Sequence, residues 1–119
     1  MRVLVVETGK LPVVREIDGS LESMQKIVGG LIQAVYPFEE PVALICNDEG
    51  KLLGLPLNRL LSETRDIISG TFIVAGCHPD TDHFSSLTKD QLIRYKARFR
   101  NPEHFLYDGN TIFVLSTTE

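Results

Sequence analysis

Residues 76–84 hold the densest group of candidate metal ligands in the chain. They read GCHPDTDHF and contain one thiol, two imidazoles and two carboxylates, from Cys77, His78, Asp80, Asp82 and His83. Transition metals bind such groups when rigid elements hold them in a fixed geometry. Here the ligands crowd one short loop, and Pro79 prevents a helical i, i+4 arrangement. We expect a surface loop without a bound metal, and we keep a metal-dependent hydrolase that uses residues 77–83 as an alternative.

No arrangement in the sequence is typical of nucleophilic catalysis. Neither cysteine lies in a catalytic motif, and no serine lies in a nucleophile elbow. Cys77 and His78 are neighbours, but consecutive residues of a strand point to opposite faces and do not normally touch. Cys46 lies in the apolar run VALICN, where a free thiol packs as a small hydrophobic group. We therefore predict no catalytic residue and no cofactor.

The segment GKLLGLPLNR, at residues 50–59, places two polar side chains in an apolar frame. Leucines flank Asn58 and Arg59, and a glycine and a proline precede them. A planar guanidinium recognises carboxylate or phosphate, and an amide recognises another amide or the edge of a base. We predict four ligand-binding residues: Asn47, Asn58, Arg59 and Thr71. The alternative is structural, with Asn58 as a helix cap and Arg59 bridging to the acidic loop at residues 39–40.

Short apolar runs separated by turn signals must position these residues. Strands are expected over residues 2–7, 11–17, 31–38, 42–47, 70–76 and 111–116. Turn residues at 8–10 and 47–50 predict two hairpins, and residues 57–61 are expected to form a helical turn. The run GTFIVAG is typical of a central strand, which we expect beside residues 3–6.

Two helices are expected between the strands. Ser20 and Thr88 are N-caps for apolar residues at helical spacing, and the helices end near residues 29 and 101. The apolar face of the second helix should hold Leu92, Tyr95, Phe99 and the stem of Lys96. The order of elements predicts a single α+β domain over residues 1–119, with a mixed or antiparallel sheet of about five to six strands and two helices mainly on one face.

Composition and charge restrict the class of protein. The 119 residues are 43% hydrophobic, and the apolar runs are far shorter than the roughly 20 residues that cross a membrane. No signal peptide precedes VLVVE, so we expect a cytoplasmic protein without a membrane partner. A net charge of −4 argues against nucleic acid as a partner, although RYKARFR at residues 94–100 is a basic cluster.

Several short motifs resemble a known family. They are the run from Asn47 through Gly50, then Leu55-Pro56, Asn58-Arg59 and Gly70-Thr71-Phe72, in that order. Over roughly residues 1–100 the chain resembles domain of unknown function 3846, a family of phages and bacterial mobile elements. The resemblance implies a small accessory protein of such an element and brings no catalytic residues. Residues 101–119 extend beyond it and contain one expected strand.

These observations lead to a non-enzymatic binding protein of phage or mobile-element origin as our first hypothesis. It would act in the host bacterial cytoplasm by binding a small anionic ligand or a host protein, without turnover. A nucleotide-derived immune signal is the ligand class we favour, by analogy with phage proteins that sequester such signals, and a host defence protein is the other target. A homo-oligomeric interaction module that docks through an exposed sheet edge is a further alternative.

Overall fold

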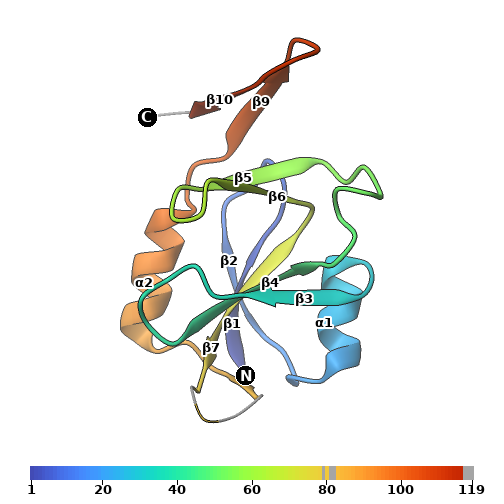
Figure 1. Cartoon of the computed structure of the whole chain (residues 1–119). Coiled ribbons are helices and arrows are strands. Elements are labelled where there is room, and N and C mark those ends of the chain that lie inside the picture. The colour runs from blue at the N-terminus through green and yellow to red at the C-terminus, as the bar shows by residue number, and fades with distance from the viewer. Residues whose placement is uncertain (79, 81–82, 117–119) are drawn as a thin grey trace.

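The computed structural model describes residues 1–78, 80 and 83–116. A six-stranded sheet lies at its centre, in the order β2-β1-β7-β4-β3 with β8 paired to β7 (Figure 1). These pairings are all antiparallel. The strands are β1 (Arg2–Val6), β2 (Val13–Glu16), β3 (Ile32–Val35), β4 (Val42–Asn47), β7 (Phe72–Cys77) and β8 (Phe84–Ser85). The α+β class, the size of the sheet and the position of residues 70–76 beside residues 3–6 are confirmed.

The inner strands of this sheet are apolar on both faces. Every residue of β4 is buried, as is every residue of β1 after Arg2. Alternate side chains divide between two cores, because neighbouring residues of a strand point to opposite sides. Leu4 and Val74 belong to one core, whereas Val3 and Ile73 belong to the other. Both faces of the sheet therefore need a cover.

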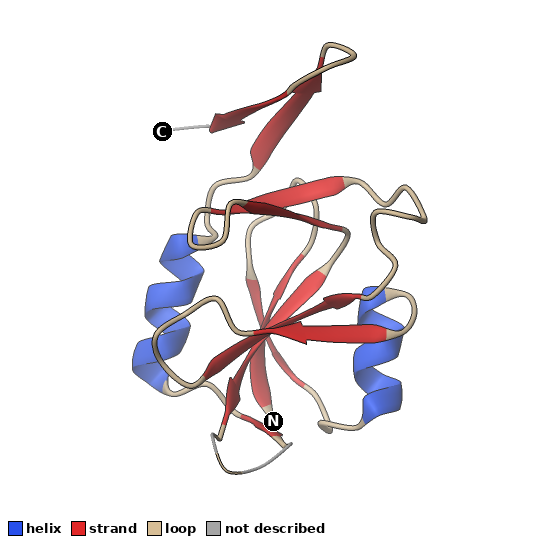
Figure 2. Cartoon of the chain, viewed as in Figure 1, coloured by secondary structure: helices blue, strands red, loops and turns tan. Residues whose placement is uncertain are grey.

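Each face is covered by one helix. Met24 and Val28 of α1 (Leu21–Val28) join the core that contains Val3. Tyr95 of α2 (Lys89–Arg98) and its C-cap Phe99 join the core that contains Leu4. Figure 2 shows the two helices on opposite sides of the sheet. The expectation that both helices lie mainly on one face is therefore corrected, because two apolar faces cannot both be covered from one side.

Local signals begin both helices as the sequence predicts. Ser20 Oγ accepts a hydrogen bond from Ser23 N at 3.1 Å at the start of α1. At the start of α2, Thr88 Oγ1 accepts from Gln91 N at 3.1 Å, and Gln91 Oε1 accepts from Thr88 N at 2.9 Å, which completes a capping box. Gly29 ends α1 with a φ of 81°, a conformation that favours glycine.

A second, two-stranded sheet covers one end of the main sheet. It pairs β5 (Leu57–Leu61) with β6 (Asp66–Ser69), so the helical turn expected over residues 57–61 is wrong. The turn at residues 47–50 is present, but it does not close a hairpin. Both edges of β4 are already occupied by β3 and β7, and the chain therefore leaves the main sheet here.

The C-terminal segment forms a third sheet. β9 (Glu103–Tyr107) and β10 (Ile112–Ser116) make an antiparallel hairpin that projects beyond β5 and β6 (Figure 1). The strand expected over residues 111–116 is confirmed. Its partner β9 was not predicted, and neither strand belongs to the main sheet.

Candidate functional site

Asn58 and Arg59, which the sequence predicts to bind a ligand, are 0% and 1% exposed. Consecutive residues of a regular strand face opposite sides. The register of β5 shifts at this point, since Leu57 pairs with Ser69 whereas Arg59 pairs with Ile68. Such a bulge disrupts the ladder at Asn58 and allows two neighbouring side chains to be enclosed together.

The guanidinium of Arg59 is fully engaged with uncharged oxygens. Nη1 donates to the main-chain oxygen of Asn58 at 3.2 Å and to its Oδ1 at 2.7 Å. Nη2 donates to the main-chain oxygens of Lys10 and Phe99 at 2.7 and 3.0 Å, and Nε donates to Phe99 at 3.2 Å. Burial lowers the pKa of Arg59, and the charge of Glu103 opposes this shift. The five donors of the side chain are thus matched by five contacts.

The amide of Asn58 completes this buried cluster. Its Nδ2 donates to the main-chain oxygens of Val6, at 2.9 Å, and Gly70, at 2.8 Å. Asn58 lies inside a strand and is not a helix cap, and Arg59 donates to main-chain oxygens and Asn58 instead of residues 39–40, so this structural alternative is corrected. A ligand would reach this pair only if the β5–β6 sheet moved away from the main sheet.

The other two predicted ligand-binding residues, Asn47 and Thr71, are not part of this buried cluster. Asn47 Nδ2 donates to Val28 O at 3.2 Å and so closes the end of α1, while its Oδ1 accepts from Glu49 N at 2.8 Å. Asn47 lines a pocket of about 130 Å³ that the other three residues do not line. Thr71 is half-buried between β6 and β7. The four residues therefore do not converge on one cavity.

The histidine-containing loop brings few ligands together. His78 Nδ1 lies 4.0 Å from Asp80 Oδ2, and both side chains are exposed. Within the described residues, no group of three or more His, Cys, Asp or Glu side chains is placed to hold a metal ion. Asp82, a member of the predicted hydrolase set, lies outside these residues. Burial raises the pKa of the Cys77 and Cys46 thiols, which disfavours the reactive thiolate.

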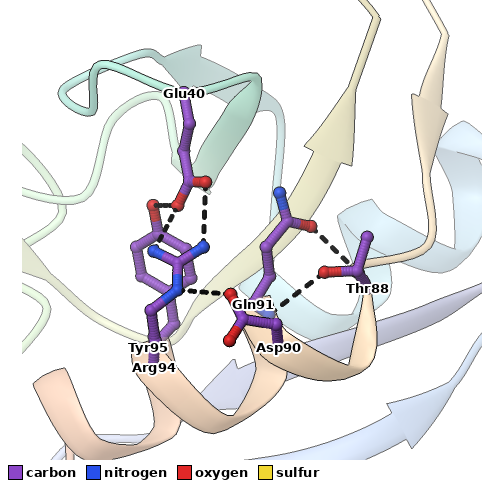
Figure 3. A network of polar contacts seen from close by, with 6 residues as sticks. All are labelled: Glu40, Thr88, Asp90, Gln91, Arg94 and Tyr95. Carbon is purple, nitrogen blue, oxygen red and sulfur yellow. Dashed lines mark hydrogen bonds and ion pairs between the residues drawn. The ribbon is translucent and has the colours of Figure 1, made fainter.

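A network of charged groups joins α2 to the loop before β4 (Figure 3). Arg94 donates to both carboxylate oxygens of Glu40, at 2.8 and 2.9 Å, and to Asp90 Oδ2 at 2.7 Å. Tyr95 Oη donates to the same carboxylate at 2.5 Å. The hydrogen bonds from Arg94 and Tyr95 lower the pKa of Glu40 to about 2. Burial and this contact raise the pKa of Tyr95.

A hollow of about 750 Å³ lies beside the network. Its size suits a small ligand, but its charges are largely balanced. Arg94 is paired with Glu40, and Arg98 is paired with Glu63 at 3.2 Å. An anionic ligand would have to displace these carboxylates, so the hollow is a poor site for a nucleotide.

A second hollow, the β2–α2 groove, has the opposite character. Its volume is about 510 Å³, and it is lined by Leu11, Pro12, Val13, Ile93, Lys96, Ala97 and Arg100. Leu11 and Ile93 are 58% and 62% exposed, so the apolar floor is open to solvent. Neither Lys96 nor Arg100 forms an ion pair with a carboxylate of residues 1–78, 80 and 83–116. The groove therefore combines apolar surface with two unneutralised positive charges.

A family model, domain of unknown function DUF3846, matches residues 1–100 of the chain. The chain belongs to the DUF3846 family. No curated protein and no solved structure matches the chain. Among the described residues, no helix is both long and apolar enough to cross a membrane.

The DUF3846 match contains the whole β2–α2 groove, and the β9–β10 hairpin lies beyond it. Sequence reasoning missed the groove because its two walls are about 80 residues apart in the chain. One wall left a signal: Ile93, Lys96 and Ala97 share a face of α2 at spacings of three and four, and Arg100 follows the C-cap Phe99. Lys96 was expected to lie with its stem on the core face of α2, but it is exposed on the groove face instead. The cluster at residues 94–100 is thus divided between the two hollows.

Proposed function

We propose that this DUF3846 protein is a non-enzymatic binding protein that holds an acidic, partly apolar segment of another protein chain in the β2–α2 groove. The observation that supports this most directly is the apolar floor beside two cations, Lys96 and Arg100, that no described carboxylate neutralises. An extended segment with both acidic and apolar side chains on one face would place apolar groups on the floor and carboxylates beside these cations.

The edge of the main sheet supports an extended conformation for the bound segment. β2 is the last strand in the sheet order, and among the described strands it pairs with β1 alone. Its outer main-chain groups are available to a further strand, as in recognition by strand addition. Apolar contacts, charge and main-chain hydrogen bonds would then act at the same place.

The family resemblance gives the setting of the proposal. If the protein is encoded by a phage or mobile element and acts in the host cytoplasm, its partner would be a host protein. The host target that we favour is a defence protein. Binding would inhibit that protein by occupying it, without turnover. The aliphatic floor of the groove offers no aromatic ring for stacking of a base, so it supports a protein segment better than a nucleotide-derived signal.

Fluorescence anisotropy with labelled peptides tests the proposal. We expect an extended peptide that repeats two valines and two glutamates to bind, because it carries both types on one face, and the matching valine and lysine peptide not to bind. The variant Lys96→Glu with Arg100→Glu should weaken binding of the acidic peptide at least tenfold, because it reverses both charges. Binding should also weaken with added salt, since the cations are exposed.

The control variant is Lys26→Glu with Lys89→Glu, which makes the same change in net charge at exposed residues outside the groove. It should keep the affinity of the parent protein. Equal binding of the acidic and basic peptides would contradict the proposal. So would binding of cyclic dinucleotides or ADP-ribose that is lost in the groove variant, since the groove would then be a nucleotide site.

A further inference from the structure

The β9–β10 hairpin exposes large apolar side chains on both of its faces. The pairing places Leu106 opposite Phe113 on one face and Tyr107 opposite Ile112 on the other. Tyr107 is 71% exposed and Leu106 is 55% exposed. A two-stranded ribbon is marginally stable by itself, and contiguous exposed apolar side chains mark interaction surfaces. The apolar side chains of the hairpin are therefore exposed, although side chains of this kind normally pack against another surface.

The hairpin does not cover its own groove. It touches the rest of the chain at its base, where Glu103 Oε1 accepts a hydrogen bond from Leu60 N at 3.1 Å. From there it extends away from β5 and β6 (Figure 1). Leu11 and Ile93, on the two walls of the groove, remain largely exposed. Both apolar surfaces are thus uncovered in one copy of the chain.

The charges of the two surfaces are complementary. The described hairpin contains two carboxylates, from Glu103 at its base and Asp108 in its turn, and no lysine or arginine. The lining of the groove contains two cations and no carboxylate. The chain as a whole has a net charge of −4, so two copies repel each other overall. The contact between hairpin and groove is one at which the charges attract.

We propose that, when no host segment is bound, the occupant of the β2–α2 groove is the β9–β10 hairpin of a second copy of this chain, and that two copies exchange hairpins. This inference rests on the proposed function, because the hairpin and the host segment would compete for the same groove. A twofold axis would allow each copy to give its hairpin and to receive the other, so both apolar surfaces are covered and the assembly closes at two chains. The free edge of β2 would receive a hairpin strand as an added strand.

Sedimentation velocity of the full chain and of two variants tests the exchange. The parent chain should sediment as a dimer, with twice the 13.3 kDa mass of one chain. The groove variant, Lys96→Glu with Arg100→Glu, and the hairpin variant, Leu106→Ser with Phe113→Ser, should each sediment as a single chain. An equimolar mixture of the two should form a dimer again, because one supplies an intact hairpin and the other an intact groove. The mixed dimer should dissociate more readily than the parent dimer, since it has one hairpin–groove contact in place of two.

The mixing experiment guards against loss of the hairpin fold. The hairpin variant contributes only its groove to the mixed dimer, so an unfolded hairpin in that variant leaves the expected result unchanged. A parent chain that sediments with the mass of one chain at every concentration would overturn the exchange. A mixture that stays monomeric, or a groove variant that keeps the dimer mass, would also overturn it.

A separate measurement distinguishes this failure from failure of the proposed function. The hairpin variant has a groove that no second hairpin fills, so its binding of the acidic peptide tests the groove directly. Tight binding of that peptide together with a monomeric parent would reject the exchange and keep the proposed function. Absence of binding would reject the proposed function itself.

Discussion

The guanidinium of Arg59 donates to the main-chain oxygen of Phe99 from two nitrogens, Nε at 3.2 Å and Nη2 at 3.0 Å. Phe99 is the C-cap of α2, where carbonyl groups lack helical partners and the helix dipole is negative. The same guanidinium reaches Lys10 and Asn58. One buried side chain of β5 therefore joins the second sheet, the β1–β2 turn and the end of α2.

Replacement of Arg59 by methionine should destabilise the fold strongly. The new side chain fills a similar volume but leaves the oxygens of Phe99 and Asn58 without donors, so we expect a loss of about 3 kcal/mol in the free energy of unfolding. Urea unfolding followed by circular dichroism measures it. Arg15→Met, at an exposed arginine, is the control and should change stability by less than about 0.5 kcal/mol. A loss below about 1 kcal/mol at Arg59 would show that these contacts contribute little.

Asn58 and Arg59 should behave as one unit. Asn58 Oδ1 accepts from Arg59 Nη1 at 2.7 Å, and each side chain also holds main-chain oxygens in place. In a double-mutant cycle of Asn58→Ala and Arg59→Met, we expect the double variant to lose less stability than the sum of the single variants, by about 1–2 kcal/mol. Additive losses would mean that the two residues act independently.

Glu40 should make stability depend on pH in the acid range. Arg94 and Tyr95 lower its pKa from 4.5 to about 2 in the folded protein. A lowered pKa stabilises the fold fully above the unfolded value, and this contribution is lost as the pH falls toward the folded value. The difference in free energy of unfolding between the parent and Glu40→Gln should therefore be constant above about pH 5 and shrink as the pH falls toward about 2. A difference that does not vary with pH would contradict the ion pair.

Replacement by alanine should have different effects on stability at two serines, Ser69 and Ser20. Ser69 Oγ is buried without a hydrogen-bond partner among the described residues, whereas Ser20 Oγ caps α1. Ser69→Ala removes an unsatisfied hydroxyl, so we expect stability to be unchanged or raised by up to about 1 kcal/mol. Ser20→Ala should lower it by about 1 kcal/mol. Thermal unfolding of both variants provides the comparison, and equal losses would contradict the different roles.

Elements with strong local signals were predictable from the sequence. The runs that became β1, β4 and β7 are continuously apolar, and Ser20 and Thr88 are followed by apolar residues at helical spacing. These features depend on neighbouring residues, whose preferences act whatever the rest of the chain does. β9 was missed because Glu103 and His104 weaken its apolar alternation.

The role of the polar residues was not predictable in the same way. The sequence determined that Asn58 and Arg59 stand among leucines, and that two helices and several apolar strands form one α+β domain. Only the tertiary structure decided that a bulge in β5 encloses both polar side chains, and that the helices lie on opposite faces. It also brought Leu11 beside Ile93 to form the groove. These outcomes depend on contacts between residues far apart in the chain, and local patterns do not specify which distant surfaces meet.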